Sequence, residues 1–212
     1  MIVKEAMSAP AISVPRTATV RQAIRVLHDH QITAAPVVGG DGRLVGIVSE
    51  MDLLRGEFEH DPRAFVRRVA TPDDPPPRWV AEVMTEDVRT ARLNGDVREV
   101  AEMMMATRIK SVPVLDGQQL VGMLSRRDLL AVLARGDARI RDDVHAALTS
   151  LVPDAADWEV RVLDGVVELR GGSRPQAEPI PELLARTVPG VVRVVVTDET
   201  AQPDQGRSRP TQ

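Results

Sequence analysis

The sequence contains an internal repeat, which constrains the fold more than any other feature. The stretch GIVSEMDLLR at residues 46–55 returns as GMLSRRDLLA at residues 122–131, with the glycine, serine, aspartate and both leucines in register. Upstream, ITAAPVV from Ile32 matches IKSVPVL from Ile109. A unit of about 50 residues buries too little apolar surface to be stable alone, so we expect the two copies to pack against each other.

Each copy predicts the same order of elements. An extended segment leads into an amphipathic helix, then a strand that contains a proline, a glycine turn, a second strand, and a closing helix that begins at the repeated serine. The pattern predicts an α/β fold of two βαββα-type repeats, at residues 1–55 and 81–135, with an insert and linker at 56–80. The expected apolar helix faces are Val20, Ala23, Ile24 and Leu27 in the first copy and Val97, Val100, Met103 and Met104 in the second.

These motifs resemble a known family. An apolar-x-x-x-Pro strand entry, followed by Gly-apolar-apolar-Ser-x-x-Asp in both copies, resembles the tandem cystathionine-beta-synthase (CBS) domains that form a Bateman module, over residues 3–133. The resemblance implies a pseudo-twofold pair that binds adenosyl ligands in clefts between the repeats, commonly as a homodimer. In this family the serine and aspartate contact phosphate and ribose, and backbone groups near the strand entry hold adenine. The ligand-binding positions carried over to this chain are Ser49, Asp52, Ser125 and Asp128, with Ile32, Thr33, Ile109 and Lys110 flanking the base.

The repeated Ser-x-x-Asp has two interpretations. A serine three residues before an acid is typical of a helix capping box, which needs no ligand. A helix N-terminus also offers unpaired N–H groups to a phosphate, and an aspartate one turn later can accept hydrogen bonds from ribose hydroxyls. On the second interpretation, Gly46 and Gly122 would let the backbone come close to a ligand.

The two copies differ in charge beside this motif. Glu50 follows the first serine, whereas Arg126 and Arg127 follow the second. A polyphosphate would be repelled near the first site and neutralised near the second. We therefore predict that Ser125, Asp128 and Arg126 form the stronger phosphate site.

Residues 137–198 predict a separate α+β domain. A helix with Ile140, Val144, Ala147, Leu148 and Leu151 on one face precedes a hairpin around Asp164-Gly165, a short helix with Pro181 in its first turn, and a last strand. The order resembles the BON domain, a bacterial module proposed to bind phospholipid surfaces and to join proteins to partners. Residues 137–199 hold 7 Arg, 12 Asp plus Glu and no Lys, so we favour a protein partner over a membrane. Residues 199–212 predict a disordered tail.

Several functional classes lack support in the sequence. The chain has no cysteine, and His28 and His30 are two apart on a predicted helix, which is a poor metal pair. It contains no catalytic motif, no basic stripe for nucleic acid, and no apolar run long enough for a signal peptide or a membrane span. We expect a cytoplasmic, non-enzymatic protein that requires no cofactor, metal or nucleic acid.

Two functional hypotheses follow. In the first, the CBS pair is a sensor that binds AMP, ADP, ATP or S-adenosylmethionine and relays its bound state through the BON domain to a protein partner. In the second, the clefts bind no ligand, and the chain is a dimerisation scaffold whose BON domain contacts protein or phospholipid.

Overall fold

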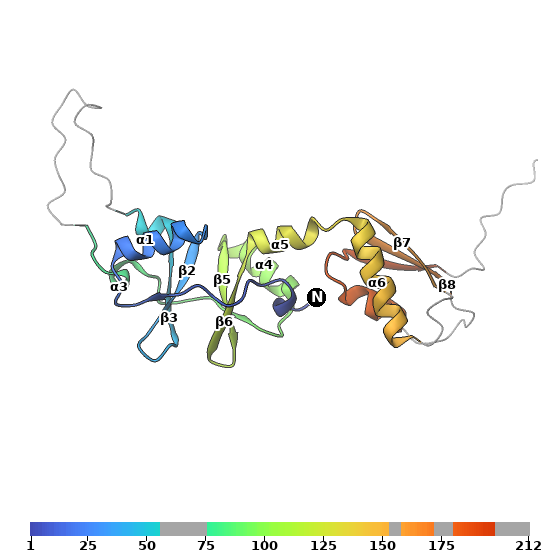
Figure 1. The fold of residues 1–212 in the computed structure, drawn as a ribbon, viewed down its shortest axis with the longest axis horizontal. Helices are drawn as coiled ribbons and strands as arrows, with labels where there is room; N and C mark the ends of the chain where they lie inside the picture. The colour runs from blue at the N-terminus through green and yellow to red at the C-terminus, as the bar shows by residue number, and fades with distance from the viewer. Residues whose placement is uncertain (56–75, 153–157, 172–179, 198–212) are drawn as a thin grey trace, which may run out of the picture. The chain divides into compact units, whose positions relative to one another are not determined.

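The computed structural model describes residues 1–55, 76–152, 158–171 and 180–197. Its contacts divide the chain into two compact units, one spanning residues 2–129 and the other beginning at Leu130 (Figure 1). Most of the predicted insert, residues 56–75, and the predicted disordered tail lie outside the described residues. No helix in the described part of the chain is long and apolar enough to cross a membrane.

The first unit contains the two repeats in the predicted βαββα order, and this prediction is confirmed. The first repeat comprises β1 (Val14–Pro15), α1 (Val20–Asp29), β2 (Ala34–Val38), β3 (Leu44–Ser49) and α2 (Glu50–Leu53). The second comprises β4 (Ala91–Arg92), α4 (Val97–Thr107), β5 (Ser111–Asp116), β6 (Gln119–Ser125) and α5 (Arg126–Leu133), whose last four residues belong to the other unit. In each three-stranded sheet the first pair is parallel and the second antiparallel.

Local sequence explains where the long helices begin. Thr19 and Gln22 form a capping box on α1, in which the Gln22 N–H donates to Thr19 Oγ1 at 3.2 Å and the Thr19 N–H donates to Gln22 Oε1 at 2.8 Å. The Asp96 carboxylate caps α4 by accepting from the Arg98 N–H at 2.9 Å. The predicted apolar faces supply the buried residues of both helices, namely Val20, Ala23 and Leu27, and Val97, Val100 and Met104.

The segment before each repeat packs on the other repeat. The short helix η1 (Val3–Glu5) lies ahead of the first repeat, yet the Val3 N–H donates to the Gly95 carbonyl of the second at 2.9 Å. Further along, the Ser8 N–H donates to the carbonyl of Met123 in β6, and the Met123 N–H donates to the Ser8 carbonyl, both at 2.9 Å.

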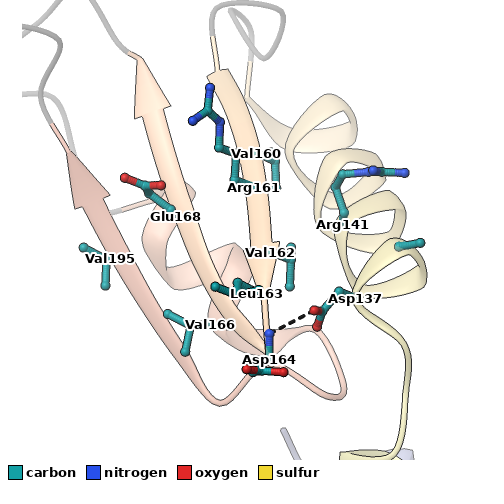
Figure 2. A pocket seen from close by; sticks show the side chains of 11 residues that line it. Asp137, Arg141, Val160, Arg161, Val162, Leu163, Asp164, Val166, Glu168 and Val195 are labelled. Carbon is teal, nitrogen blue, oxygen red and sulfur yellow. Dashed lines mark hydrogen bonds between the residues drawn. The ribbon is translucent and has the colours of Figure 1, made fainter.

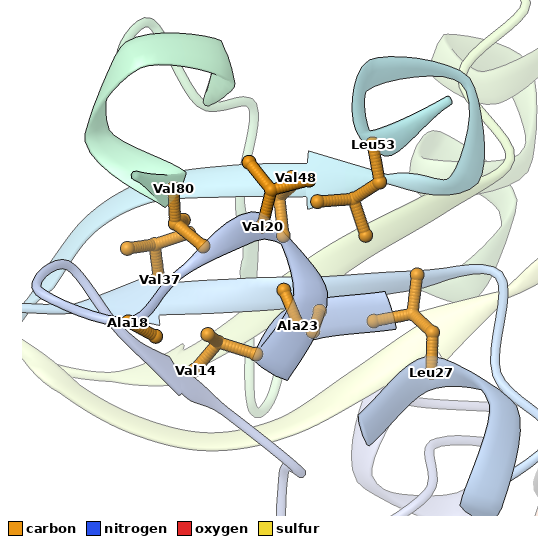
Figure 3. Close-up of a cluster of buried hydrophobic side chains, with 10 residues drawn as sticks. Val14, Ala18, Val20, Ala23, Leu27, Val37, Val48, Leu53 and Val80 are labelled. Atoms are coloured by element: carbon orange, nitrogen blue, oxygen red, sulfur yellow. The ribbon is translucent and has the colours of Figure 1, made fainter. Parts of the chain in front are cut away.

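The segment before the second repeat packs on the first repeat in the same way. Each residue in these contacts is replaced by the residue about 77 positions away, which is its counterpart in the other repeat. The Val80 N–H at the start of α3 (Val80–Val83) donates to the Ala18 carbonyl at 2.9 Å. The Thr85 N–H donates to the carbonyl of Ile47 in β3, and the Ile47 N–H donates to the Thr85 carbonyl, both at 2.9 Å. Trp79 and Val80, predicted to belong to the linker, therefore lie in the structure of the first repeat. The side chain of Val80 is buried in the first repeat's core (Figure 3), whose other members are Val14, Ala18, Val20, Ala23, Leu27, Ala35, Val37, Val48 and Leu53.

The repeated glycines are explained by this exchange rather than by space for a ligand. A Cβ atom built on Gly122 would lie 2.8 Å from the Ser8 carbonyl oxygen and 2.8 Å from Met7 Sδ. A Cβ atom on Gly46 would lie 2.7 Å from Met84 Sδ. Only glycine lets the exchanged segment approach each strand this closely.

The second unit is an α+β domain. It contains α6 (Asp137–Leu151), β7 (Trp158–Leu163), β8 (Val166–Gly171), α7 (Ile180–Thr187) and β9 (Arg193–Thr197). The sheet order is β7-β8-β9, with β7 antiparallel and β9 parallel to β8. The two helices pack on one face of the sheet, in a core formed by Ile140, Val144, Leu148, Val167, Leu169, Ala185, Val188 and Val194.

The hairpin turn of this unit is confirmed at the predicted residues. Asp164 and Gly165 have φ values of 50° and 73°, as a type I′ turn requires. The Asp137 carboxylate at the start of α6 accepts from the Asp164 N–H and the Gly165 N–H, both at 2.9 Å (Figure 2). The prediction that Leu151 shares the buried face of α6 is wrong: it ends the helix and is 66% exposed.

We predict that Gly122→Ala destabilises the first unit by about 2 kcal/mol, because its Cβ would clash with the Ser8 carbonyl, which is backbone and moves only with its segment. The measurement is urea unfolding followed by Trp79 fluorescence in a Trp158→Phe background, since the chain has two tryptophans. Gly40→Ala is the matched control, because a Cβ there meets nothing within 4 Å. Equal midpoints for the two variants would contradict this account of the glycine.

We predict that Asp137→Ala destabilises the second unit by about 2 kcal/mol, because two N–H groups of the hairpin turn lose their acceptor. The measurement is the same unfolding experiment followed by Trp158 fluorescence in a Trp79→Phe background. Asp142→Ala serves as the control, since it removes only an exposed ion pair with Arg141. A loss as small as that of the control would show that the carboxylate does not hold the turn.

Candidate ligand-binding site

In the second repeat, Ser125 and Asp128 form a complete capping box where β6 passes into α5. Asp128 Oδ2 accepts from the Ser125 N–H at 2.7 Å and from Ser125 Oγ at 2.6 Å, and the Asp128 N–H donates to Ser125 Oγ at 3.2 Å. Both side chains are half-buried. The helix N-terminus is therefore capped by the motif's own side chains.

The first repeat carries the same arrangement at Ser49 and Asp52. Asp52 Oδ2 accepts from the Ser49 N–H at 2.9 Å and from Ser49 Oγ at 2.6 Å. The helix that follows differs in length, since α2 has four residues and α5 has eight. The dipole at a helix N-terminus grows with the number of aligned peptide groups, so α5 is the better of the two for an anion.

The structure brings each Ser-x-x-Asp motif to the strand entry predicted to flank the base. The Glu50 N–H donates to the Thr33 carbonyl at 3.0 Å, and the Arg126 N–H donates to the Lys110 carbonyl at 2.9 Å. Thr33 and Lys110 are exposed, whereas their neighbours Ile32 and Ile109 are half-buried. In both repeats, residues about 17 positions apart in the chain thus meet at the start of the closing helix.

The Arg126 side chain, predicted to strengthen a phosphate site, forms hydrogen bonds to two backbone carbonyls in the structure. Its Nε donates to the Ile109 carbonyl at 3.0 Å and its Nη2 donates to the Met104 carbonyl at 3.3 Å. Met104 contributes one of the last four carbonyls of α4, which have no partner within the helix. The guanidinium group therefore caps α4. Both Arg126 and Arg127 are exposed residues.

Sequence analysis missed Ser8, which the structure places at the second site. Ser8 lies on the exchanged N-terminal segment, and its Oγ donates to Asp128 Oδ1 at 3.1 Å. The signal was present in the repeat, because Met7-Ser8 aligns with Met84-Thr85 at an offset of 77 and both copies keep a hydroxyl. The Asp128 carboxylate thus receives donors from two parts of the chain that are more than a hundred residues apart.

In the residues that the structure describes, no group of three or more histidine, cysteine, aspartate or glutamate side chains lies close enough to hold a metal ion. Carboxylate oxygens, serine hydroxyls and backbone groups at a helix start can bind a polyhydroxylated or phosphorylated small molecule.

Comparison with known proteins gives one family match, repeated in the chain. A family model described as CBS domain matches residues 3–59 and 80–135, which together make up more than half of the chain. Each match contains one Ser-x-x-Asp motif and one strand entry.

Curated relatives match the same part of the chain. Homoserine O-acetyltransferase of Methanocorpusculum labreanum is 29% identical over 133 residues, which is 61% of this chain and 23% of that protein. Inosine-5'-monophosphate dehydrogenase of Methanocaldococcus jannaschii is 30% identical over 120 residues, which is 56% of this chain and 21% of that protein. The chain thus spans less than a quarter of the length of these relatives.

Solved structures share the fold of the first unit. The CBS domain pair of protein MJ0100, in complex with 5'-methylthioadenosine and S-adenosyl-L-methionine, is 27% identical with a TM-score of 0.50, over 62% of this chain and 94% of that one. An uncharacterised conserved protein from Pyrococcus horikoshii is 26% identical with a TM-score of 0.52, over 64% of this chain and 93% of that one.

We predict that Arg126→Ala lowers the stability of the first unit by about 1 kcal/mol, because the carbonyls of Ile109 and Met104 lose their donor. Arg127→Ala is the control, because it removes the same charge at the next residue. We expect it to change the free energy of unfolding by no more than about 0.5 kcal/mol. Urea unfolding followed by Trp79 fluorescence compares the two variants. Identical midpoints would show that the cap on α4 contributes nothing measurable.

Proposed function

The chain belongs to the CBS domain family, with two tandem CBS domains, and on that premise we propose that it is a regulatory protein that binds an adenosyl ligand. The observation that carries the proposal is the meeting of a Ser-x-x-Asp motif with its strand entry at the start of the closing helix in both repeats. The similar CBS pair bound to 5'-methylthioadenosine and S-adenosyl-L-methionine supports this class of ligand.

We propose a division of labour within each site. Asp52 and Asp128 accept hydrogen bonds from the two ribose hydroxyls, and the serine hydroxyls and helix N-termini receive phosphate or another polar group. Backbone groups at Ile32 and Thr33, or at Ile109 and Lys110, read the adenine. A ribose hydroxyl at Asp128 Oδ1 would take the place of the Ser8 hydroxyl that donates there now.

The second site is proposed as the stronger one. The helix that follows Ser125 is twice as long as the one that follows Ser49, and Arg126 and Arg127 replace Glu50 and Met51. Arg126 caps α4, so we propose that it attracts a phosphate mainly through the positive electrostatic potential that it adds to the site, rather than through a direct hydrogen bond. AMP, ADP, ATP and S-adenosylmethionine are the candidate ligands.

The proposed mechanism of regulation is a shift between two packings of the repeats. A ligand stabilises the packing it binds more tightly, by its difference in affinity. We propose that the second unit, which has the α-β-β-α-β order of a BON domain, passes this state to a protein partner, and that the chain acts without catalysis or a resident cofactor. Homodimerisation through the CBS pair is part of the proposal. It is supported by Met51 on α2 and Leu54 directly after it, which are 74% and 47% exposed.

One observation favours the alternative function, a scaffold with unliganded clefts. Both aspartates already accept two hydrogen bonds from their own serine. A motif satisfied within the chain can be retained for capping alone. Ligand binding therefore has to be tested directly.

We predict that an adenosyl ligand raises the melting temperature of the full chain. At 100 times its dissociation constant, a ligand adds about 2.7 kcal/mol to the free energy of unfolding. The measurement is a thermal melt against AMP, ADP, ATP, S-adenosylmethionine and 5'-methylthioadenosine, repeated on Asp128→Asn and Asp52→Asn, which keep the size of the side chain. We expect Asp128→Asn to lose most of the shift and Asp52→Asn to lose less.

Asp116→Asn is the control, because Asp116 ends β5 and pairs with Gln119, at the opposite end of the β5–β6 ladder from Ser125. It should keep the full shift. A well-folded protein that no compound stabilises would overturn the sensor and leave the scaffold. A shift that survives both Asp52→Asn and Asp128→Asn would place the ligand elsewhere.

A further inference from the structure

The second unit has an open sheet edge at β7. In the sheet order β7-β8-β9, β7 pairs only with β8 and its other edge has no strand beside it among the described residues. A hollow of about 860 Å³ lies against β7, and five consecutive residues from Val160 to Asp164 line it (Figure 2). Its other lining residues come from α6 and from the two neighbouring strands, namely Asp137, Ala138, Arg141, Val166, Glu168 and Val195. The hollow therefore follows β7 over most of the strand's length.

The strand lacks several of the features that usually block an exposed edge. Proteins protect edges with charged side chains, especially lysine, and with proline, bulges or very short strands. The two charged side chains of β7, Glu159 and Arg161, have opposite signs. The sequence WEVRVL of β7 has no proline or lysine. Its six residues pair with β8 without a register shift, unlike the β2–β3 and β5–β6 pairs. The edge is regular enough to accept another strand.

The hairpin turn determines which backbone groups face outward. A two-residue I′ turn at Asp164 and Gly165 makes Leu163 and Val166 a hydrogen-bonded pair, and such pairs alternate along an antiparallel ladder. Leu163, Arg161 and Glu159 therefore point their backbone groups toward β8. The N–H and carbonyl groups of Val162, Val160 and Trp158 face the open edge.

The charges on β7 complement a second copy of the same strand. Glu159 and Arg161 lie on the sheet face opposite the helices, on either side of Val160. In an antiparallel pairing centred on Val160, Glu159 of one strand lies opposite Arg161 of the other, twice. These are non-hydrogen-bonded pairs, in which the side chains are closest. On the helix side, Trp158 would lie opposite Val162 and Val160 opposite itself.

The other edge of the sheet lacks this complementarity. Centred on Val195, β9 would place Arg193 opposite Thr197 and Val194 opposite Val196. No pair of opposite charges forms. A self-pairing β9 would thus be held by backbone and apolar contacts only, with nothing to select its register.

We propose that β7 pairs antiparallel with β7 of a second copy of this chain, about a twofold axis at Val160, and joins two three-stranded sheets into one of six strands. Glu159 and Arg161 set the register. The interface lies in the second unit, so it is distinct from the dimer proposed for the CBS pair.

Charge variants of the full chain test the pairing. In Glu159→Arg, two arginines face each other twice across the axis, and in Arg161→Glu two glutamates do. We expect each variant to raise the dissociation constant of this association at least about tenfold, from the reversed sign of two cross-strand pairs. An equimolar mixture of the two variants restores complementary pairs and should associate as the unmodified chain does. So should the double variant E159R/R161E.

Sedimentation velocity across a concentration series measures the association. Arg193→Glu reverses the same charge on the exposed β9 edge strand and should leave the association unchanged. The proposal is overturned if the unmodified chain shows no association, if the single variants associate as it does, or if the mixture fails to restore assembly. Ligand-dependent melting of E159R separates a failure here from a failure of the proposed sensor.

A cross-link tests the register itself. The chain has no cysteine, so each introduced thiol is the sole one in its chain. E159C mixed with R161C places two thiols directly opposite, at a Cα separation near 4.5 Å, whereas E159C alone places them two residues apart. We expect a disulfide-linked dimer in the mixture and little in either variant alone. Equal cross-linking in all three samples would overturn the assigned register.

Discussion

The first unit is held together at two places, where one backbone segment crosses a strand at a glycine. At Gly122 the segment carrying Met7 and Ser8 crosses β6, and at Gly46 the segment carrying Met84 and Thr85 crosses β3. Each crossing is closed by a pair of backbone hydrogen bonds. The repeats cannot be separated without breaking both, so the pair is one structural body rather than two adjacent domains.

The candidate site depends on the same crossing. Asp128 accepts from its own serine through one oxygen and from Ser8 through the other. A ligand that bound Asp128 would compete with Ser8 for the carboxylate. A movement of the N-terminal segment would change the hydrogen bond that the carboxylate accepts from Ser8. In the proposed function, ligand binding and the packing of the repeats would thus be linked through a single side chain.

Sequence predicted the elements better than it predicted their partners. The order of strands and helices followed from apolar spacing, and the turn at Asp164-Gly165 followed from the conformational demand of a two-residue hairpin. The exchanged segments could not be predicted this way, because periodicity says which face of an element is buried and not which of two similar repeats covers it. Arg126 shows a related limit. Its charge predicted an anion as partner, and the structure shows it donating to the carbonyls of Ile109 and Met104.

The reciprocal exchange also determines the order in which the protein can fold as it is made. The segment at Met7 and Ser8 is synthesised first, but its partner Met123 follows 115 residues later. The first repeat needs Val80 to complete its core, so it stays unfinished until the chain has entered the second repeat. Contacts so distant in sequence slow folding, because the intervening chain must be ordered before they form. On the ribosome, the segment at Met7 and Ser8 therefore cannot pair with β6 until nearly the whole first unit has emerged.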